Sequence, residues 1–290
     1  QEISRALQAD LGKAPFESYM TEVGLTLSEL IYVLRHLDGW TREKKVPTPL
    51  AQFHGKSFTV PEPYGVVLVM APWNYPFLLT MEPLIGALAA GNCCVLKPSE
   101  DAPRTSAVIA SLLEEIYPKS YVTVVEGDRK ISAALLEQRF DYIFFTGSVS
   151  VGKLVMEQAA KHLTPVTLEL GGKSANIYFD DCKWDMAIDG LQLGILFNQG
   201  QVCCAGSRVF VQEGIYDKFV EAAARAAKKR YPFLAYVHGT AGIRIQEGTH
   251  GVIQMPRCTV AVRRYIESGG LYLVLYDTNS FAGPVASFLG

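Results

Sequence analysis

The chain has 290 residues, of which 49% are hydrophobic and 19% are charged, and its formal net charge is −2. This composition is typical of a globular protein with a buried core, and the length allows one large domain or two ordinary ones. The balanced charge gives no basic surface for nucleic acid or an anionic membrane, so we expect neither as a partner.

The cysteines and histidines bear on metal and redox chemistry. Six cysteines, at positions 93, 94, 182, 203, 204 and 258, form no CxxC pair and no regular framework. This pattern argues against structural zinc and against a secreted disulfide scaffold. The five histidines show no HExxH or other paired-ligand spacing. We therefore predict no metal, reduced thiols and a cytoplasmic location.

The predicted elements begin with helix over the first forty or so residues. Apolar residues recur at helical spacing from Leu27 to Leu37, and Pro47 and Pro49 then open an extended stretch. Further along, the expected strands are Gly65–Met70, Cys93–Leu96, Tyr121–Val125, Tyr142–Phe145 and Pro165–Glu169. The expected helices are Phe77–Ala90, Arg104–Tyr117, Ile131–Gln138 and Val151–His162. Apolar strands separated by helices predict βαβ units and a parallel sheet covered on both faces.

A second unit is expected to begin near Gly171. Its predicted strands and helices are Ala175–Phe179, Trp184–Phe197, Arg208–Val211 and Ile215–Arg230, and beyond Tyr231 only Val260–Ser268 is periodic. The nearly uncharged segment Tyr64–Leu96 is long enough to span a bilayer. Its three prolines and Glu82 favour a strand, a loop and a helix instead, so we expect no membrane span.

Two Gly-containing segments carry candidate chemistry. Phe197–Ser207 places Cys203 in a loop of small residues, and Thr167–Ser174 places Glu169 in another, 203 − 169 = 34 positions earlier. A thiolate nucleophile with a separately placed base is what covalent catalysis on a carbonyl needs. The alternatives are that Cys203 and Cys204 are merely small buried residues, and that Glu169 is a structural carboxylate paired with Lys or Arg.

Three further motifs follow predicted strands. Ala71–Phe77 contains Trp73 and Asn74, and by itself it would be interpreted as a turn. Val95–Glu100 contains Lys97, Ser99 and Glu100, a string that exposed helix starts share. Phe145–Lys153 is a strand, a Gly turn and a helix start, where backbone amides can bind a pyrophosphate. The chain contains no GxGxxG fingerprint.

Together these segments resemble the NAD(P)-dependent aldehyde dehydrogenases over roughly residues 15–230. Lys161–Glu169 resembles the class 3 branch of fatty and aromatic aldehyde enzymes, whereas the Cys203 loop resembles classes 1 and 2. The resemblance implies an α/β fold with a Rossmann-like doubly wound parallel sheet, which binds NAD, over residues 1–170 with N-terminal helices. It implies an α/β catalytic domain over 171–290, incomplete because it is truncated or rearranged after about residue 230. The family forms homodimers or tetramers, and the C-terminal departure makes such assembly doubtful here.

The resemblance also implies residue roles for NAD-dependent oxidation of an aldehyde to a carboxylic acid. Cys203 corresponds to the nucleophile that forms the thioester, Glu169 to the base that activates water, and Asn74 to a donor in the oxyanion hole. The implied cofactor-binding residues are Trp73, Lys97, Ser99, Glu100, Gly147, Ser148, Gly152 and Gly171. A carboxylate at Glu100 facing the adenosine ribose favours NAD over NADP.

The C-terminal region leaves other functions open. Phe281–Val285 weakly matches the family's Glu-x-Phe-Gly-Pro-Val segment, which puts Ser280 at the Glu position and Ala282 at the Phe position. A neutral hydroxyl cannot replace the two acceptor oxygens of a carboxylate. The main alternative is therefore a catalytically impaired scaffold that binds a dinucleotide or serves a structural role. Glu169 argues against acyl transfer to coenzyme A, and the lack of a histidine motif argues against a cysteine hydrolase.

Overall fold

The computed structural model describes residues 1–227, 233–237 and 272–276. The chain divides into two compact units, Gln1–Gly171 and Gly172–Gly290, and each is described by itself. Val260–Ser268, Ser280 and Phe281–Val285 lie outside the described residues. None of the helices in the described ranges combines the length and the hydropathy that crossing a membrane would need.

The first unit starts with the predicted helices, but they are broken into pieces. These are α1 (Glu2–Leu11), α2 (Pro15–Ser18), a π-helical turn η1 (Tyr19–Val23) and α3 (Gly24–Trp40). Gly12 ends α1 in the left-handed region with φ 69°, and Pro15 starts the next helix, so Gly and Pro separate the two. Leu27, Leu30, Ile31 and Leu34 of α3 are exposed in this structure, whereas Val33 is buried.

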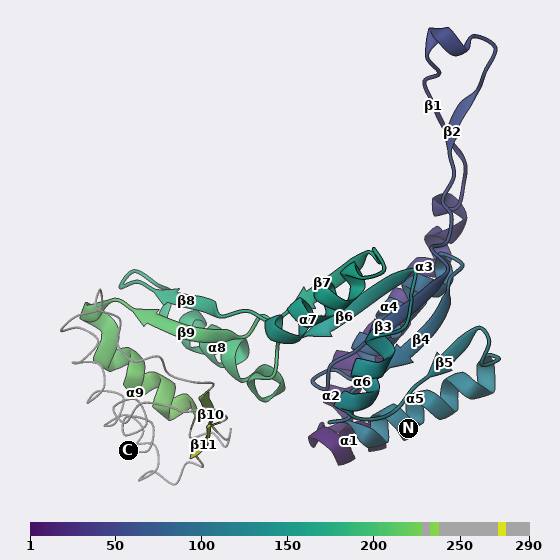
Figure 1. The fold of residues 1–290 in the computed structure, drawn as a ribbon. Coiled ribbons are helices and arrows are strands. Elements are labelled where there is room, and N and C mark those ends of the chain that lie inside the picture. Colours follow the sequence, from purple (N-terminus) through teal and green to yellow (C-terminus); the bar gives the residue numbers. More distant parts are fainter. Residues whose placement is uncertain (228–232, 238–271, 277–290) are drawn as a thin grey trace. The chain divides into compact units, whose positions relative to one another are not determined.

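The extended stretch predicted after Pro47 is part of an antiparallel hairpin. Strand β1 (Lys44–Val46) pairs with β2 (Ser57–Thr59), with Lys44 opposite Thr59, and a 3₁₀ turn η2 (Leu50–Gln52) lies at the far end. Pairing thus begins before Pro47, because the prolines themselves have no N–H to donate to a partner strand. The hairpin projects away from the sheet at the end of α3 (Figure 1).

The core of this unit is a five-stranded sheet in which every pair of neighbours is parallel. The strands are β3 (Val66–Met70), β4 (Cys93–Lys97), β5 (Val122–Val124), β6 (Tyr142–Gly147) and β7 (Val166–Leu170). Their order is β5-β4-β3-β6-β7, so the chain moves outward from β3 in one direction and then restarts on its other side. This is the doubly wound order of dinucleotide-binding folds, with the switch point between β3 and β6. The predicted α/β fold class is confirmed.

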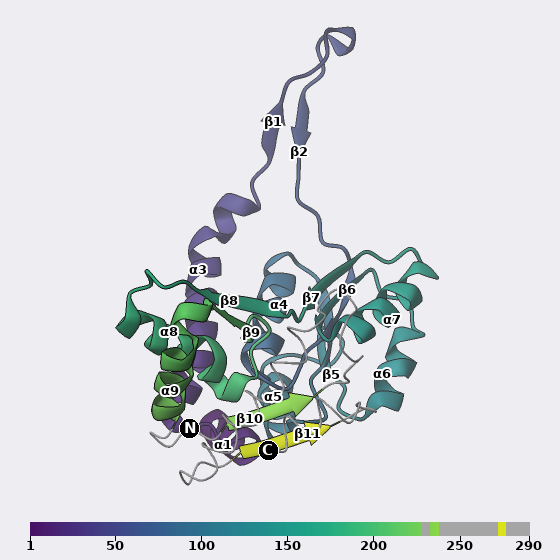
Figure 2. The ribbon, with the colours of Figure 1, turned by 90° about the vertical axis from the view of Figure 1, so that its left-hand side faces the viewer.

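Helices cover both faces of the sheet, as the apolar strands require. Alternate residues of β3 divide between two cores: Val67 and Val69 face α4 (Leu78–Ala89) and α5 (Pro103–Ile116), whereas Leu68 and Met70 face the opposite side. That second core contains residues of α6 (Arg129–Leu136) and α7 (Val149–Ala160). The two helices lie on the same side of the sheet (Figure 2). Strands buried on both faces explain the continuous apolar runs in the sequence.

One close approach between α7 and β7 leads to a test of this packing. A Cβ placed on buried Gly152 would lie 2.7 Å from Leu170 Cδ2. We expect Gly152→Val to lower the free energy of unfolding by about 1–3 kcal/mol, since the added atoms overpack the contact. Urea unfolding followed by circular dichroism measures the change. Gly86→Ala in α4, where no atom lies within 4 Å of the new Cβ, is the control and should stabilise by about 0.5–1 kcal/mol. Equal effects of both substitutions would contradict the contact.

The second unit is also α/β. Its elements are β8 (Ser174–Tyr178), α8 (Trp184–Leu196), η3 (Phe197–Gly200), β9 (Gly206–Val211), η4 (Glu213–Ile215), α9 (Tyr216–Ala227), β10 (Phe233–Val237) and β11 (Tyr272–Tyr276). Strands β8 and β9 are parallel and joined through α8, which makes a βαβ unit. Phe219 of α9 is 2% exposed and its ring contacts Tyr178 and Trp184. Strands β10 and β11 form a separate parallel pair.

Candidate active site

The loop that carries Cys203 begins with an unusual backbone turn. Asn198, Gln199 and Gly200 have φ values of 48°, 59° and 74°, so three consecutive residues are left-handed. Each non-glycine residue in this region costs about 1–2 kcal/mol. The Asn198 side chain is buried and donates from Nδ2 to the carbonyl of Gln201, 3.2 Å away. Neither Asn198 nor Gln199 was singled out from the sequence, although Asn tolerates this conformation better than most residues.

Cys203 itself is exposed and its backbone is anchored. Its carbonyl accepts a hydrogen bond from the Gly172 N–H at 3.2 Å, and Gly172 belongs to the Gly-rich loop that follows Glu169. Desolvation raises the pKa of the Cys203 thiol above its usual value. Cys204 raises it further, while the backbone amides of the two cysteines act in the opposite direction. A thiol with a raised pKa needs a higher pH, or a bound ligand nearby, to become the reactive thiolate.

The effect of Cys204 on the pKa of Cys203 predicts that the Cys203 thiol reacts at lower pH when the Cys204 side chain is removed. In Cys204→Ala the Coulombic and hydrogen-bonding effects of Cys204 on Cys203 are lost, so the pKa of Cys203 should fall. Because only the thiolate is alkylated, the pH profile of iodoacetamide labelling at Cys203 should move to lower pH. Peptide mass spectrometry at a series of pH values measures that profile. Cys182→Ala is the matched control and should leave it unchanged; a shift to higher pH in Cys204→Ala would contradict the assignment.

In the first unit the predicted site residues gather at one edge of the sheet. Parallel strands end together: Met70 is in register with Lys97 and Phe145, and Gly147 is in register with Leu170. The predicted residues follow or end these strands, namely Trp73 and Asn74 after β3, Lys97, Ser99 and Glu100 at and after β4, Gly147 and Ser148 at and after β6, and Glu169 and Gly171 at and after β7. Ligands of doubly wound folds bind at this carboxyl edge.

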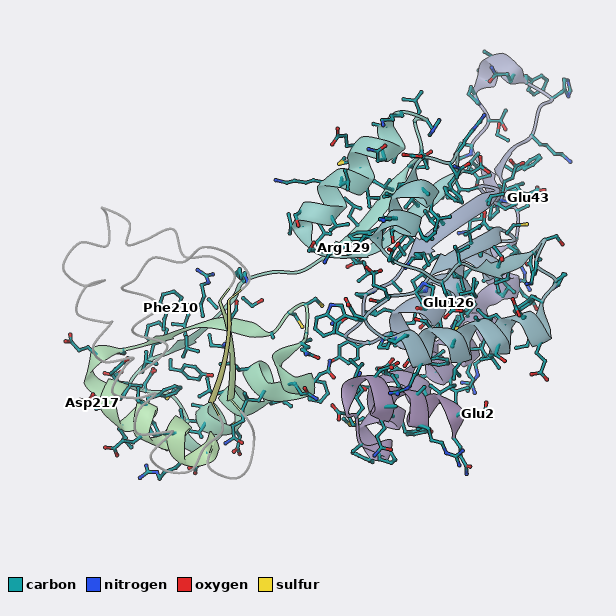
Figure 3. All side chains as sticks on the ribbon, turned by 60° about the horizontal axis from the view of Figure 1, so that its bottom comes forward. Glu2, Glu43, Glu126, Arg129, Phe210 and Asp217 are labelled. Atoms are coloured by element: carbon teal, nitrogen blue, oxygen red, sulfur yellow. The ribbon has the colours of Figure 1, made fainter. Side chains whose placement is uncertain are left out.

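Lys97 and Glu100 interact with each other at this edge. Lys97 is 3% exposed, and its Nζ donates to the carbonyl of Pro98 at 2.8 Å and lies 3.5 Å from Glu100 Oε2. The other carboxylate oxygen, Oε1, lies 3.9 Å from Nε of Arg129, which is 98% exposed at the start of α6 (Figure 3). Ser99 has an internal role as well, because its Oγ accepts from the Asp101 N–H at 3.2 Å. Glu100 thus keeps an exposed carboxylate beside two cations.

The turn from β6 into α7 is shaped for close approach of a ligand. Ser148 is the N-cap of α7, and its Oγ accepts from the Val151 N–H at 3.3 Å. A Cβ on Gly147 would lie 2.5 Å from the Phe145 ring, so only glycine fits there. The Gly171 N–H donates to the Gly147 carbonyl at 3.3 Å and ties the two loops together. A glycine turn at a helix N-terminus suits a pyrophosphate, so the residues present fit a dinucleotide.

Glu169 lies near the carboxyl end of β7, opposite Thr146 of β6, and its side chain is exposed. Among the residues that the structure describes, no Lys or Arg forms a salt bridge with it. This disfavours the interpretation of Glu169 as a structural carboxylate with a cationic partner. Its side chain is accessible to water or a substrate.

The predicted catalytic residues therefore divide between the two units. Asn74 and Glu169 share the carboxyl edge of the first unit, and Cys203 belongs to the second. Gly172, the first residue of the second unit, joins the two by sequence and is hydrogen-bonded to Cys203. What the fold and these residues define is a doubly wound α/β domain followed by a unit with an exposed cysteine.

Comparison with known sequences gives the family. The profile of the Aldehyde dehydrogenase family matches residues 1–232, and the chain belongs to this family. The chain is 43% identical over 230 residues to 4,4'-diaponeurosporen-aldehyde dehydrogenase of Staphylococcus aureus, covering 79% of this chain and 50% of that protein. It is 45% identical over 217 residues to human aldehyde dehydrogenase family 3 member B1, covering 75% and 46%. The chain thus spans about half the length of these relatives.

Solved structures agree with this assignment. The substrate-bound state of Staphylococcus aureus AldH matches with a TM-score of 0.75 and 38% identity, over 90% of this chain and 56% of that one. Betaine aldehyde dehydrogenase of Staphylococcus aureus with NAD⁺ matches with a TM-score of 0.69 and 35% identity, over 80% and 46%. Succinic semialdehyde dehydrogenase of Streptococcus pyogenes with NADP⁺ matches with a TM-score of 0.70 and 27% identity, over 80% and 50%. Similar structures therefore contain either dinucleotide.

Proposed function

We propose that this protein oxidises an aldehyde to a carboxylic acid through a covalent intermediate on Cys203, with NAD as hydride acceptor. The observation that carries the proposal is that Cys203 is exposed and that its backbone carbonyl accepts a hydrogen bond from the loop that follows Glu169. Membership of the aldehyde dehydrogenase family supports the reaction class. In this proposal residues 1–170 bind the dinucleotide and residues 171–290 provide the nucleophile.

Each catalytic residue has one task in the proposed reaction. The Cys203 thiolate adds to the carbonyl carbon of the aldehyde, and the Asn74 side-chain amide donates a hydrogen bond to the oxygen that becomes negative. When bound, NAD supplies the acceptor for the hydride of the aldehyde carbon. Cys203 is left carrying a thioester. Glu169 takes a proton from the water that attacks this thioester, which releases the acid and frees the thiol.

The dinucleotide is proposed to lie along the carboxyl edge of the sheet. Lys97 and Glu100 would hold the adenosine ribose, with Trp73 and Ser99 beside them, and the β6–α7 turn at Gly147, Ser148 and Gly152 would face the pyrophosphate, with Gly171 in the adjoining loop. The exposed carboxylate of Glu100 supports NAD over NADP, because it accepts hydrogen bonds from a free 2′-hydroxyl and repels a 2′-phosphate.

A reducing location is part of the proposal. The five cysteines in the described ranges are all free thiols, and two of them, Cys203 and Cys204, are exposed. Exposed thiols persist in the reduced state in the cytoplasm. We accordingly place the protein there.

The test is the absorbance of NADH at 340 nm, with a short aliphatic and an aromatic aldehyde as substrates and with NAD or NADP as cofactor. The expected result is reduced cofactor formed with at least one aldehyde and a higher kcat/KM with NAD. No reduced cofactor with either would contradict the proposed oxidation. If NAD still raised the melting temperature, the alternative of a dinucleotide-binding scaffold would replace it.

A further inference from the structure

A buried ion pair in the N-terminal segment lies against the loop that carries Asn74. Lys13 and Glu22 are 1% and 0% exposed, and Lys13 Nζ lies 2.5 Å from Glu22 Oε1. Lys13 follows the left-handed Gly12, and Glu22 belongs to the π-helical turn η1. Neither residue belongs to a motif that the sequence makes visible. Charged side chains are almost never buried this deeply unless they are paired. The burial of Lys13 and Glu22 therefore depends on their pairing, and we ask what the pair contacts.

Both members of the pair bond to the Asn74 loop as well as to each other. Lys13 Nζ donates to the carbonyl oxygen of Asn74 at 2.9 Å, and it lies 4.3 Å from the centroid of the Tyr75 ring. Glu22 Oε2 accepts from the backbone N–H groups of Phe77 and Leu78 at 2.8 and 3.1 Å. The loop between β3 and α4 is thus held at its middle by a cation and at its end by a carboxylate.

The cost of burying the Lys13–Glu22 ion pair argues for a role other than overall stability. Burial raises the pKa of the Glu22 carboxyl, and the positive charge of Lys13 offsets part of that shift. A buried ion pair is seldom more stabilising than apolar residues of the same size, so overall stability alone is a weak reason for it. Its directional bonds do what apolar contacts cannot, because they fix the backbone oxygen of Asn74 and two amides at defined points. Fixing that backbone limits where the Asn74 side-chain amide can lie.

We propose that Lys13 and Glu22 are positioning residues for the Asn74 amide, holding its loop so that the amide meets the developing oxyanion. This inference rests on the proposed function, since it concerns the same oxygen. Displacement of a catalytic group by about 1 Å can cost roughly 10²-fold in rate. Asn74 is the group that touches the substrate; the ion pair acts only through it.

A second carboxylate provides an internal comparison. Asp10 accepts from the backbone N–H groups of Arg104 and Thr105 at 3.3 and 2.7 Å, and from the Thr105 hydroxyl at 2.9 Å, so it caps α5 as Glu22 caps α4. These bonds of Asp10 go to the start of α5, which α4, β4 and the loop after β4 separate in sequence from the Asn74 loop. Asp10→Ala therefore removes a cap supplied by the N-terminal segment without releasing Asn74.

The experiment is a double-mutant cycle on kcat. Asn74→Ala should lower kcat by about 10²–10³-fold, and Lys13→Met by about 10–10²-fold. If Lys13 acts through Asn74, the double variant should be no slower than Asn74→Ala alone. Asp10→Ala should leave kcat within about twofold and should combine with Asn74→Ala multiplicatively. Losses from Lys13→Met and Asn74→Ala that multiply in full would overturn the positioning role.

A further variant keeps the test valid if Lys13→Met does not fold because Glu22 is left unpaired. Lys13→Met/Glu22→Leu removes both charges, and we expect it to regain the melting temperature lost by the single variant. It should still have a lowered kcat and an unchanged NAD-induced thermal shift. Wild-type kcat in this folded variant would overturn the inference while leaving the proposed function intact. Absence of NADH from the wild-type chain would instead contradict the proposed function, and the positioning role with it.

Discussion

Replacing Cys203 by Ala should abolish aldehyde-dependent NADH formation, with a loss of at least about 10⁴-fold. Alanine has no nucleophilic atom that can add to the carbonyl carbon. We expect no substitution by the neighbouring Cys204, because the left-handed turn from Asn198 to Gly200 fixes the position of this loop and Cys204 lies one residue beyond the reacting position. The measurement is initial velocity at 340 nm under saturating aldehyde and NAD.

Two comparisons separate loss of the nucleophile from loss of the fold. Cys203→Ala should show the same NAD-induced rise in melting temperature as the wild type, because the proposed dinucleotide site lies in the first unit. Cys182→Ala, which also removes a free thiol from the second unit, should retain full activity. Activity that survives in Cys203→Ala and disappears in Cys204→Ala would transfer the nucleophilic role to the neighbour.

Replacing Glu169 by Gln should separate the two halves of the reaction. Addition of the thiolate and release of hydride do not need a base that acts on water, so the first turnover should still occur. Hydrolysis of the Cys203 thioester should slow by about 10²–10⁴-fold. We therefore expect a burst of about one NADH per active site, followed by a much slower steady state. Stopped-flow absorbance at 340 nm resolves the two phases, and intact-protein mass spectrometry should detect the acyl adduct.

Glu157→Gln is the matched control, since Glu157 is an exposed carboxylate on α7. It should leave both phases unchanged. A slow reaction without a burst in Glu169→Gln would show that the carboxylate acts before the thioester forms, for example by taking the proton of the thiol. The order of proton transfers proposed above would then be wrong.

The sheet of the first unit was predictable because local sequence and burial agree there. The runs Val66–Met70, Cys93–Leu96 and Tyr142–Phe145 are apolar, as strands covered on both faces must be, and a helix follows each. The carboxyl edge follows from parallel topology alone. It was therefore possible to expect the Asn74, Lys97, Gly147 and Glu169 segments at one edge. Their catalytic and binding roles stay predictions.

Other features depend on contacts that no local pattern contains. The bond from Lys13 to the Asn74 carbonyl spans 61 residues, and nothing in the composition of either segment selects that partner. At the left-handed turn before Cys203, Asn198 is buried and bonds to Gln201, and the local sequence does not reveal these contacts. The hairpin at Lys44 to Thr59 is short and lies beside two prolines, which weaken any strand signal.

The N-terminal segment has a consequence for how this protein is made. Asp10 and Glu22 are two of its carboxylates, and their partners at the starts of α5 and α4 lie 95 and 55 residues further along the chain. During synthesis Glu22 has no helix end to bind until Leu78 has been added, and Asp10 has none until Thr105 has been added. Docking of the segment is therefore a late, long-range step, of the kind that folds slowly. This segment can therefore complete the first unit only after the starts of both helices, α4 and α5, are present.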